Sequence, residues 1–395
     1  MELITSIISS VLLSISLGIL GIWIYFAIFV SKSLRYAPKL DKMIESKERV
    51  DVILPARNEE RFIAKCLDSL LKQDYKHLRI IAIDDSSTDN TANIIKEYAR
   101  RDDRVVYLHA GEKPEGWTGK NWACYQGYLK SDADLLLFTD ADSTFATNLV
   151  SLAVSKFVAN ALDALTLMPR IQCFDIFTKI TLPLLNNILY SRYSPLRVND
   201  PKSKLGYFFG SFFIIKRSVY EKVGTHKGVK DELVEDGALG SKVKNAGYKL
   251  MMARAEEYFN AVWARDFHTL WNALGRLVAP LYANAKFTAI GIFLATFFLF
   301  LYPFISLIYS IIFQGIIENI LLVANIITCI IMLSMSIVQA INLRLNPLYA
   351  LGIPIGAVII VFGFLGGILN ARRKGVRWRD RDYVYKVYKA DGFQP

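Results

Sequence analysis

The sequence predicts an open, mostly parallel α/β sheet accompanied by membrane-spanning helices at both ends of the chain. Short β-branched runs alternate with helical patterns from Val50 onward, which is typical of strands joined by crossover helices. Four long runs carry no charged residue: 3–30, 287–317, 320–342 and 346–370. Each is long enough to cross a hydrocarbon core of about 30 Å at ~1.5 Å per residue.

The α/β pattern places polar residues where strands end. The strand-like runs VDVILPA, LRIIAID, RVVYLHA and ADLLLF each lead into a polar, acidic or glycine-containing turn. After the first run, apolar residues recur at helical spacing: Ile63, Leu67, Leu70 and Leu71. Ligands of open α/β sheets bind at the carboxyl ends of the strands. We therefore expect the functional residues of this chain in those turns.

The first apolar run predicts an uncleaved anchor. It is about twice as long as the apolar region of a signal peptide, and no basic residue precedes it. Basic residues follow it directly, at Lys32, Arg35, Lys39 and Lys42. The positive-inside rule then places the soluble domain in the cytoplasm of a cell-membrane protein. The expected segments are an anchor (1–31), a soluble domain (32–286), a membrane region (287–370) and a basic aromatic tail (371–395).

The tail predicts contact with anionic lipid head groups. Its basic residues alternate with aromatic ones, and it adds to a net charge of +11 for the chain. Nucleic-acid binding is the other interpretation of such a tail, but the adjoining span disfavours it. Four crossings would put the tail opposite the soluble domain, against the charge rule. The last run contains Pro354 and several glycines and can be re-entrant, so we expect a cytoplasmic tail.

The cysteines and the segment 173–196 give little evidence about the reaction. The four cysteines show neither metal-binding spacing nor a paired framework, which indicates free thiols in a reducing compartment: Cys66, Cys124, Cys173 and Cys329. A stretch at residues 173–196 places apolar residues along one side of a predicted helix, at Phe174, Phe177, Ile180, Leu184 and Leu185. That helix can lie at a membrane interface and admit a lipid. An ordinary core helix fits the pattern equally well.

Three acidic pairs are candidate site residues. Asp84 and Asp85 end the second strand, where a carboxylate can accept hydrogen bonds from a nucleobase or a ribose; helix capping is the alternative. Asp140 and Asp142 bracket Ala141 after an apolar strand. Such close carboxylates suit a divalent cation that bridges to a diphosphate, although a solvated turn has the same composition.

The third pair begins a helix. Glu235 and Asp236 precede Leu239 and Val243, which we expect to face inward. Acidic residues at a helix N-terminus are also favoured by the helix dipole alone. By itself, each acidic pair is weak evidence for a functional site. The order of the motifs along the chain is what favours a particular function.

Six motifs occur in the order PARNEE, DDSSTD, GWTGKNWA, FTDADS, GSFFIIKRSVYEKVG and VEDGALGSKVKNAGYKL. This series resembles the family-2 inverting glycosyltransferases of GT-A fold and covers roughly residues 50–276. Within that family the chain is most similar to a membrane-anchored subgroup that acts on lipids. The subgroup includes hopanoid-associated and carotenoid glycosyltransferases and, more distantly, ceramide glucosyltransferase. The loop from Trp117 to Lys120 and the tail VRWRDRDYVY carry this narrower likeness.

The resemblance implies a role for each matching residue. Those expected to bind the nucleotide are Pro55, Arg57, Glu59, Asp84, Asp85 and Lys120. Asp140 and Asp142 would hold a Mg²⁺ or Mn²⁺ ion against the donor diphosphate. Asp236 would be the general base, with Glu235 beside it. The sugar or acceptor pocket would include Gly210, Ser211 and Arg276.

One departure from the family pattern indicates a single sugar transfer rather than synthesis of a polymer. Processive synthases carry a Gln/Arg-x-x-Arg-Trp element, whereas LWNALGRLVAP keeps Arg276 but has Ala273 and Leu277 in place of Gln and Trp. The expected reaction is therefore a single hexose transfer from a nucleotide-diphosphate sugar to a lipid hydroxyl. The alternatives are a polyprenyl-phosphate sugar synthase, a processive polysaccharide synthase, a nucleotidyltransferase and a non-enzymatic membrane scaffold.

Overall fold

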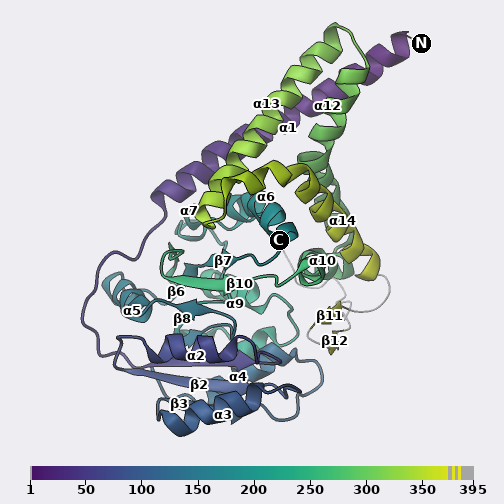
Figure 1. Ribbon diagram of the computed structural model, residues 1–395. Coiled ribbons are helices and arrows are strands. Elements are labelled where there is room, and N and C mark those ends of the chain that lie inside the picture. Colours follow the sequence, from purple (N-terminus) through teal and green to yellow (C-terminus); the bar gives the residue numbers. More distant parts are fainter. Residues whose placement is uncertain (1, 372–375, 379–380, 384–395) are drawn as a thin grey trace. The chain divides into compact units, whose positions relative to one another are not determined.

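The structure is a computed structural model that describes residues 2–371, 376–378 and 381–383 (Figure 1). It divides the chain into two compact units. The sheet unit comprises Tyr36–Gln172 and Tyr193–Val262. The apolar-helix unit comprises the described residues before Tyr36, the segment Cys173–Arg192 and the described residues from Trp263 onward. The domain boundaries expected from sequence stay predictions.

The sheet unit contains a seven-stranded sheet with the order β3-β2-β1-β4-β8-β6-β9. β1 pairs in parallel with both β2 and β4, which confirms the predicted open, mostly parallel sheet. β8 runs antiparallel to its neighbours β4 and β6. The strands are β1 (Val50–Ala56), β2 (Leu78–Asp84), β3 (Val105–His109), β4 (Leu135–Phe138), β6 (Ala164–Met168), β8 (Phe213–Lys216) and β9 (Leu250–Arg254).

Helices and a small second sheet complete this unit. The second sheet has the order β5-β10-β7, from Thr144–Phe145, Phe259–Val262 and Arg170–Gln172. The helices are α2 (Ile63–Leu71), α3 (Thr91–Arg101), α4 (Gly119–Lys130), α5 (Leu149–Ala159), α7 (Pro195–Val198), α8 (Arg217–Lys222), η1 (His226–Val229) and α9 (Glu235–Asn245). In α2, the predicted apolar face is buried at Ile63, Leu67 and Leu70. In α9, Leu239 and Val243 are buried as expected.

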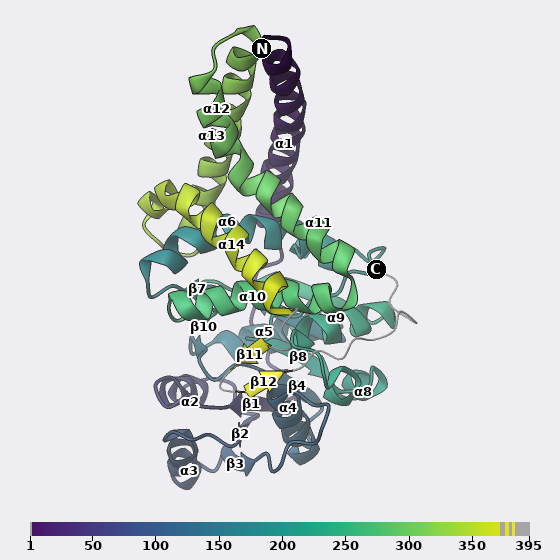
Figure 2. The same cartoon turned by 90° about the vertical axis from the view of Figure 1, so that its right-hand side faces the viewer.

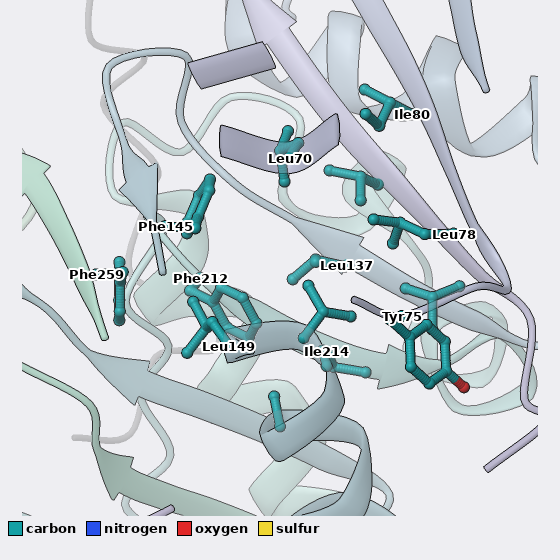
Figure 3. Close-up of a cluster of buried hydrophobic side chains, with 14 of the residues drawn as sticks. Leu70, Tyr75, Leu78, Ile80, Leu137, Phe145, Leu149, Phe212, Ile214 and Phe259 are labelled. Carbon is teal, nitrogen blue, oxygen red and sulfur yellow. The ribbon is translucent and has the colours of Figure 1, made fainter. Parts of the chain in front are cut away.

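The core of the sheet unit is built from buried residues of both sheets and of α2, α3 and α5 (Figure 3). Every residue of β1 is buried, as expected for a central parallel strand. The rings of Phe145 and Phe259 stack with centroids 5.9 Å apart, and Phe212 lies 5.6 Å from Phe259. Full burial of such a side chain stabilises the fold by roughly 1.5–3 kcal/mol. β4 and β8, which pair with each other, both contribute side chains to this core.

The apolar-helix unit contains four stretches that are long and apolar enough to cross a membrane, as the sequence predicted: Ile4–Tyr36, Lys286–Ile312, Ile316–Asn342 and Pro347–Ala371. Its helices are α1 (Glu2–Tyr36), α6 (Ile176–Arg192), α10 (Phe267–Asn284), α11 (Lys286–Thr296), the π-helical η2 (Phe297–Leu301), α12 (Tyr302–Ile312), α13 (Ile316–Asn342), η3 (Pro347–Gly352) and α14 (Ile353–Ala371). A hairpin pairs β11 (Val376–Trp378) with β12 (Arg381–Tyr383). The rest of the predicted interfacial tail lies outside the described residues.

Within the apolar-helix unit, α1 lies beside α12 and α13 (Figure 2), and polar side chains join α1 to its neighbours. Ser16 on α1 lies 3.2 Å from the hydroxyl of Tyr302 and donates to Oδ1 of Asn325. Trp23 donates its ring N–H to the carbonyl of Leu299. Hydrogen bonds between apolar helices are worth about 0.6–2 kcal/mol each and fix which helices are neighbours.

The expectation of an amphipathic surface helix near residue 180 is wrong for most of α6. All residues from Ile180 to Asn187 are buried, whereas Phe174 and Phe177 before and at its first turn are 48% and 41% exposed. The cause is packing on more than one side, because α6 contacts both α13 and α14. The core-helix alternative therefore describes this segment better.

A close crossing of α10 and α14 gives a first prediction. A Cβ added at Gly367 would lie 2.7 Å from backbone atoms of Gly275, so alanine there would force the helices apart. We expect Gly367→Ala to destabilise the unit by about 1–3 kcal/mol. The fraction of protein that remains monodisperse after heating in detergent measures this loss of stability. Gly21→Ala is the matched control, because nothing lies within 4 Å of its added Cβ. Equal heat resistance of both variants would contradict the crossing.

Candidate active site

Two turns at the carboxyl ends of β1 and β2 are tied together by Arg57. Its Nη1 donates to the carbonyls of Asp85 and Ser86, at 2.6 and 2.9 Å. Glu59 is buried, and its backbone N–H donates to Oγ1 of Thr91 at the start of α3. Pro55 lies within β1, one residue before the strand ends. The structure thus brings the predicted nucleotide-binding residues of these two strands to one edge of the sheet.

Asp84 and Asp85 differ in their surroundings. Both are buried, but the carboxylate of Asp84 accepts from the backbone N–H of Ser87 at 3.1 Å and lies 3.4 Å from Nδ1 of His109. These contacts stabilise the turn after β2, which favours a structural role for Asp84. The backbone N–H of Asp85 donates to the carbonyl of Ala56 at 2.9 Å, which continues the β1–β2 pairing by one residue. Contact of either carboxylate with a nucleotide stays a prediction.

Lys120 brings three of the sequence motifs together. Thr118 caps α4 by accepting from the N–H of Asn121, which sets Lys120 in the first turn of the helix. The Nζ atom lies 2.8 Å from Oδ1 of Asp140, after β4, and 2.8 Å from Oε1 of Glu235, at the start of α9. One ammonium therefore bridges carboxylates from two distant segments.

Asp140 and Asp142 are candidates for a cation site that is completed by substrate. The side chain of Asp140 is 33% exposed, while Asp142 is buried. Among the described residues, no group of three or more His, Cys, Asp or Glu side chains could hold a metal ion. Mg²⁺ commonly uses one or two carboxylates and takes its other ligands from substrate phosphates and water. The donor set fits that arrangement, and the metal assignment stays a prediction.

Asp236 is held by backbone N–H groups. Gly210 donates to its Oδ2 and Gly237 to its Oδ1, each at 2.8 Å. A Cβ added at Gly210 would lie 2.7 Å from Oδ2 of Asp236 and 3.2 Å from Nζ of Lys120, so only glycine fits there without displacement. The carbonyl of Ser211 accepts from Oγ1 of Thr139, at 2.7 Å. The segment Gly210–Ser211 therefore connects the end of β4 to the start of α9.

The charges of this cluster act on one another strongly. Burial, followed by the neighbouring Glu235 carboxylate, raises the pKa of Asp236 from its usual 3.8 to about 7. Burial alone would lower the pKa of Lys120, but the carboxylates of Asp140, Glu235 and Asp236 outweigh it and raise that pKa well above 10.5. Lys120 therefore faces the carboxylates of three acidic residues.

Two residues near this cluster escaped the sequence analysis. Tyr207 stacks on Tyr193 with centroids 4.3 Å apart, and burial together with Asp236 raises its pKa well above 10. Asn121 donates through Nδ2 to three carbonyls of the loop before α9: Val229, Lys230 and Glu232. The N-cap pattern at Thr118 marks the start of α4, but no local signal shows which loop Asn121 would hold. Arg276 lies on α10, in the apolar-helix unit, and its role stays a prediction.

Comparison with known proteins agrees with this geometry. Residues 51–224 match the model of the family "Glycosyl transferase family 2". The 4,4'-diaponeurosporenoate glycosyltransferase of Staphylococcus haemolyticus is 39% identical over 110 residues, which cover 27% of this chain and 28% of that protein. Its counterpart in Staphylococcus aureus is 26% identical over 208 residues, 52% of this chain and 54% of that protein. The matched regions thus span about half or less of these relatives.

One solved structure shares the fold over nearly its whole length. The mannosyltransferase PcManGT from Pyrobaculum calidifontis, in complex with GDP-Man and Mn²⁺, aligns with a TM-score of 0.53 and 16% identity. The alignment covers 91% of this chain and 99% of that one. The sheet unit is thus an α/β domain of GT-A fold. Residues 51–224 of the chain are similar to glycosyl transferase family 2.

The raised pKa of Asp236 gives a prediction about stability. The folded protein binds this proton up to about pH 7 and the unfolded chain only up to about pH 3.8. The free energy of unfolding should therefore fall as pH rises from 4 to 7 and then level off. Asp236→Asn removes this contribution, so its stability relative to wild type should increase with pH across that window.

Denaturant unfolding at pH 5 and pH 8, followed by circular dichroism, measures this difference. Asp103→Asn is a suitable control, because that side chain is exposed on the surface of the sheet unit. If Asp236→Asn and Asp103→Asn change stability equally at both pH values, Asp236 has no raised pKa in the folded protein.

Proposed function

We propose that this chain transfers a hexose from a nucleotide-diphosphate sugar to a hydroxyl group of a membrane lipid, with inversion at the sugar carbon. The observation that carries this proposal is the cluster of Lys120, Asp140, Glu235 and Asp236, which combines a buried carboxyl group with a site that can accept a cation. The family of residues 51–224 and the four long apolar helices support it.

The donor would bind at the carboxyl ends of β1, β2 and β4. Arg57 organises the turns after β1 and β2, where Glu59 and Asp85 are candidates for contacts to the nucleoside. Asp140 and Asp142 would hold a Mg²⁺ or Mn²⁺ ion against the diphosphate. Such an ion stabilises the charge that develops on the leaving nucleoside diphosphate. The Mn²⁺ and GDP-Man of the mannosyltransferase structure are consistent with this donor arrangement.

Asp236 would be the general base. Inverting transfer occurs in one displacement: the acceptor oxygen bonds to the anomeric carbon while the bond from that carbon to the diphosphate breaks, and the acceptor proton passes to a carboxylate. A base works best when its pKa lies near the working pH, and the pKa of Asp236 is about 7. The N–H groups of Gly210 and Gly237 hold the carboxylate in one orientation. Lys120 offsets the neighbouring negative charge.

The acceptor would enter from the membrane. The apolar helices suit an integral protein of the cell membrane, and the basic residues after α1 favour a cytoplasmic sheet unit. The Staphylococcus relatives are named for diaponeurosporenoate, a carboxylate by its name. An ionised acceptor of this kind, or a polyprenyl phosphate, is the second candidate. Neither needs a base, so the role of Asp236 distinguishes these acceptors from a hydroxyl.

The cation assignment predicts the effect of two conservative substitutions. Asp140→Asn and Asp142→Asn keep the side-chain size but remove the charges that would hold the metal. We expect each to lower donor turnover at least tenfold, and chelation by EDTA to abolish the activity of the wild type. Asp103→Asn should turn over donor like the wild type. Full activity of both aspartate variants in EDTA would remove the metal from the mechanism.

The base assignment predicts a larger and pH-dependent loss. For a hydroxyl acceptor, Asp236→Asn should lower the transfer rate by about 10²–10⁴-fold with donor saturating, the usual contribution of a general base. The wild-type kcat/KM for the donor, which reports the free enzyme, should rise with pH up to about 7, and this acidic limb should vanish in the variant. Glu235→Gln should reduce transfer less than Asp236→Asn does. Glu235 pairs with Lys120 and is not the group that would accept the proton.

The same measurement separates the acceptor classes. An Asp236→Asn rate within about threefold of wild type, with no acidic limb lost, is too small a change for a general base. That outcome would reject the hydroxyl acceptor and support an ionised one. Donor binding, followed by protection of the protein from thermal unfolding, controls for damage to the site.

A further inference from the structure

The two ends of the apolar helix bundle differ in charge. The hydroxyl of Ser9 near the start of α1 lies 3.0 Å from that of Tyr309 and donates to Glu318, so the turn between α12 and α13 lies at the same end. We call this the acidic end, because residues 2–31 and 287–343 contain Glu2 and Glu318 but no Lys or Arg. The opposite, basic end carries Lys32, Arg35, Lys286 and Arg344.

The contacts along α1 show that three stretches run the full length between these ends. From Ser9 to Ser16 to Trp23, the partners move from Tyr309 to Tyr302 to Leu299. α1 is therefore antiparallel to the α11–α12 stretch. The matching pairs Ser9–Glu318 and Ser16–Asn325 make α1 parallel to α13. A chain that starts at the acidic end is thus at the basic end after α13.

α14 begins at the basic end and stays with helices of that end. Cβ atoms added at Gly352 and Gly356 would touch Ile180 of α6, and one at Gly363 would touch Leu274 of α10. α6 itself meets the last turn of α13, where Gln339 donates to Asn187. α10 directly precedes Lys286 in the sequence.

The contacts of the second half of α14 show whether this helix returns to the acidic end. A helix returning to the acidic end would bring its last residues level with Ser9 and Tyr309. Instead, Gly366 meets Trp271 and Gly367 meets Gly275, both on α10. α14 also contacts η3, α11 and η2, and the last two form the part of that crossing from Lys286 to Leu301.

The outer face of α14 is apolar and exposed. Leu351 at the end of η3 and Ile355, Val358, Phe362 and Leu369 of α14 follow helical spacing along one face and are 41–65% exposed, while glycines on the other face approach α6 and α10. The neighbouring rings of Phe177 and Phe267, 5.0 Å apart, are also about 40% exposed. Exposed apolar patches of this size mark surfaces that contact a membrane or another apolar partner.

We propose that α14 does not cross the membrane but forms, with α6 and α10, an apolar shelf that inserts into the lipid leaflet at the basic end of the bundle. The chain then crosses three times, by α1, by α11–α12 and by α13. The last described residue of α14, Ala371, then lies on the same side as Lys32 and Arg35, and the sequence that follows it is basic, as the positive-inside rule requires for that side. Four crossings would place Ala371 at the acidic end. This proposal is independent of the reaction catalysed.

Thiol labelling in intact cells tests the number of crossings. Single cysteines are introduced as Gln314→Cys at the acidic end, Ser46→Cys in the segment after α1, and Ala371→Cys at the end of α14. Each is compared with the unsubstituted chain, whose four cysteines set the background. We expect Ala371→Cys and Ser46→Cys to react alike with an impermeant maleimide, and Gln314→Cys oppositely. If Ala371→Cys follows Gln314→Cys instead, α14 crosses the membrane and the proposal is overturned.

Depth measurement provides a second test that does not depend on labelling efficiency in cells. Nitroxide labels are placed at Val358, in the middle of α14, and at Ile326, near the middle of α13; both side chains are about 40% exposed. In phosphatidylcholine–phosphatidylglycerol vesicles, relative collision rates with oxygen and a nickel chelate report depth. The shelf predicts that Val358 lies several-fold more accessible to the nickel chelate than Ile326. Equal values would show that α14 spans the bilayer.

Discussion

The candidate site depends on one ammonium group held between two carboxylates. Lys120 contacts Asp140 and Glu235 at 2.8 Å each, and Asp236 adjoins the same group. Two unit charges 4 Å apart interact by about 4 kcal/mol at the effective dielectric constant of a protein site. Without Lys120, three acidic groups from different segments would repel one another at that scale. The ammonium therefore allows the turn after β4 and the start of α9 to approach.

Local patterns sufficed to predict the strands, their polar ends and the order of the acidic motifs, because each depends on hydrophobic spacing or turn chemistry within a few residues. The position of Lys120 could not be predicted in this way. Its partners lie in distant parts of the chain, and a sequence motif gives the type of a residue but not its ion pair. The same holds for Asn121, whose three acceptors belong to the loop before α9. The antiparallel direction of β8 is likewise a property of the assembled sheet.

Hydropathy identified the four apolar helices but not the neighbours against which each of them packs. α14 has the composition of a crossing helix, yet its glycines bring it against α6 and α10 rather than along α1. α6 shows the converse: the apolar residues along one side suggested a helix with an exposed polar face, but Asn186 and Asn187 are buried in the helix unit as well. In both cases, close packing at small residues decided the arrangement, and packing partners are not visible in a single helix pattern.

The charge balance of the site would link binding of the proposed donor to ionisation of Asp236, the proposed base. The cluster already contains three acidic groups and one ammonium, and a nucleoside diphosphate adds further negative charge. Lys120 cannot neutralise the diphosphate while it also balances Asp140 and Glu235. Additional positive charge at Asp140 and Asp142 would relieve this excess and would favour the ionised form of Asp236, since a nearby cation lowers the pKa of a carboxyl group. The base would then be most fully ionised when the donor and its cation are bound, which is when a proton must be removed from the acceptor.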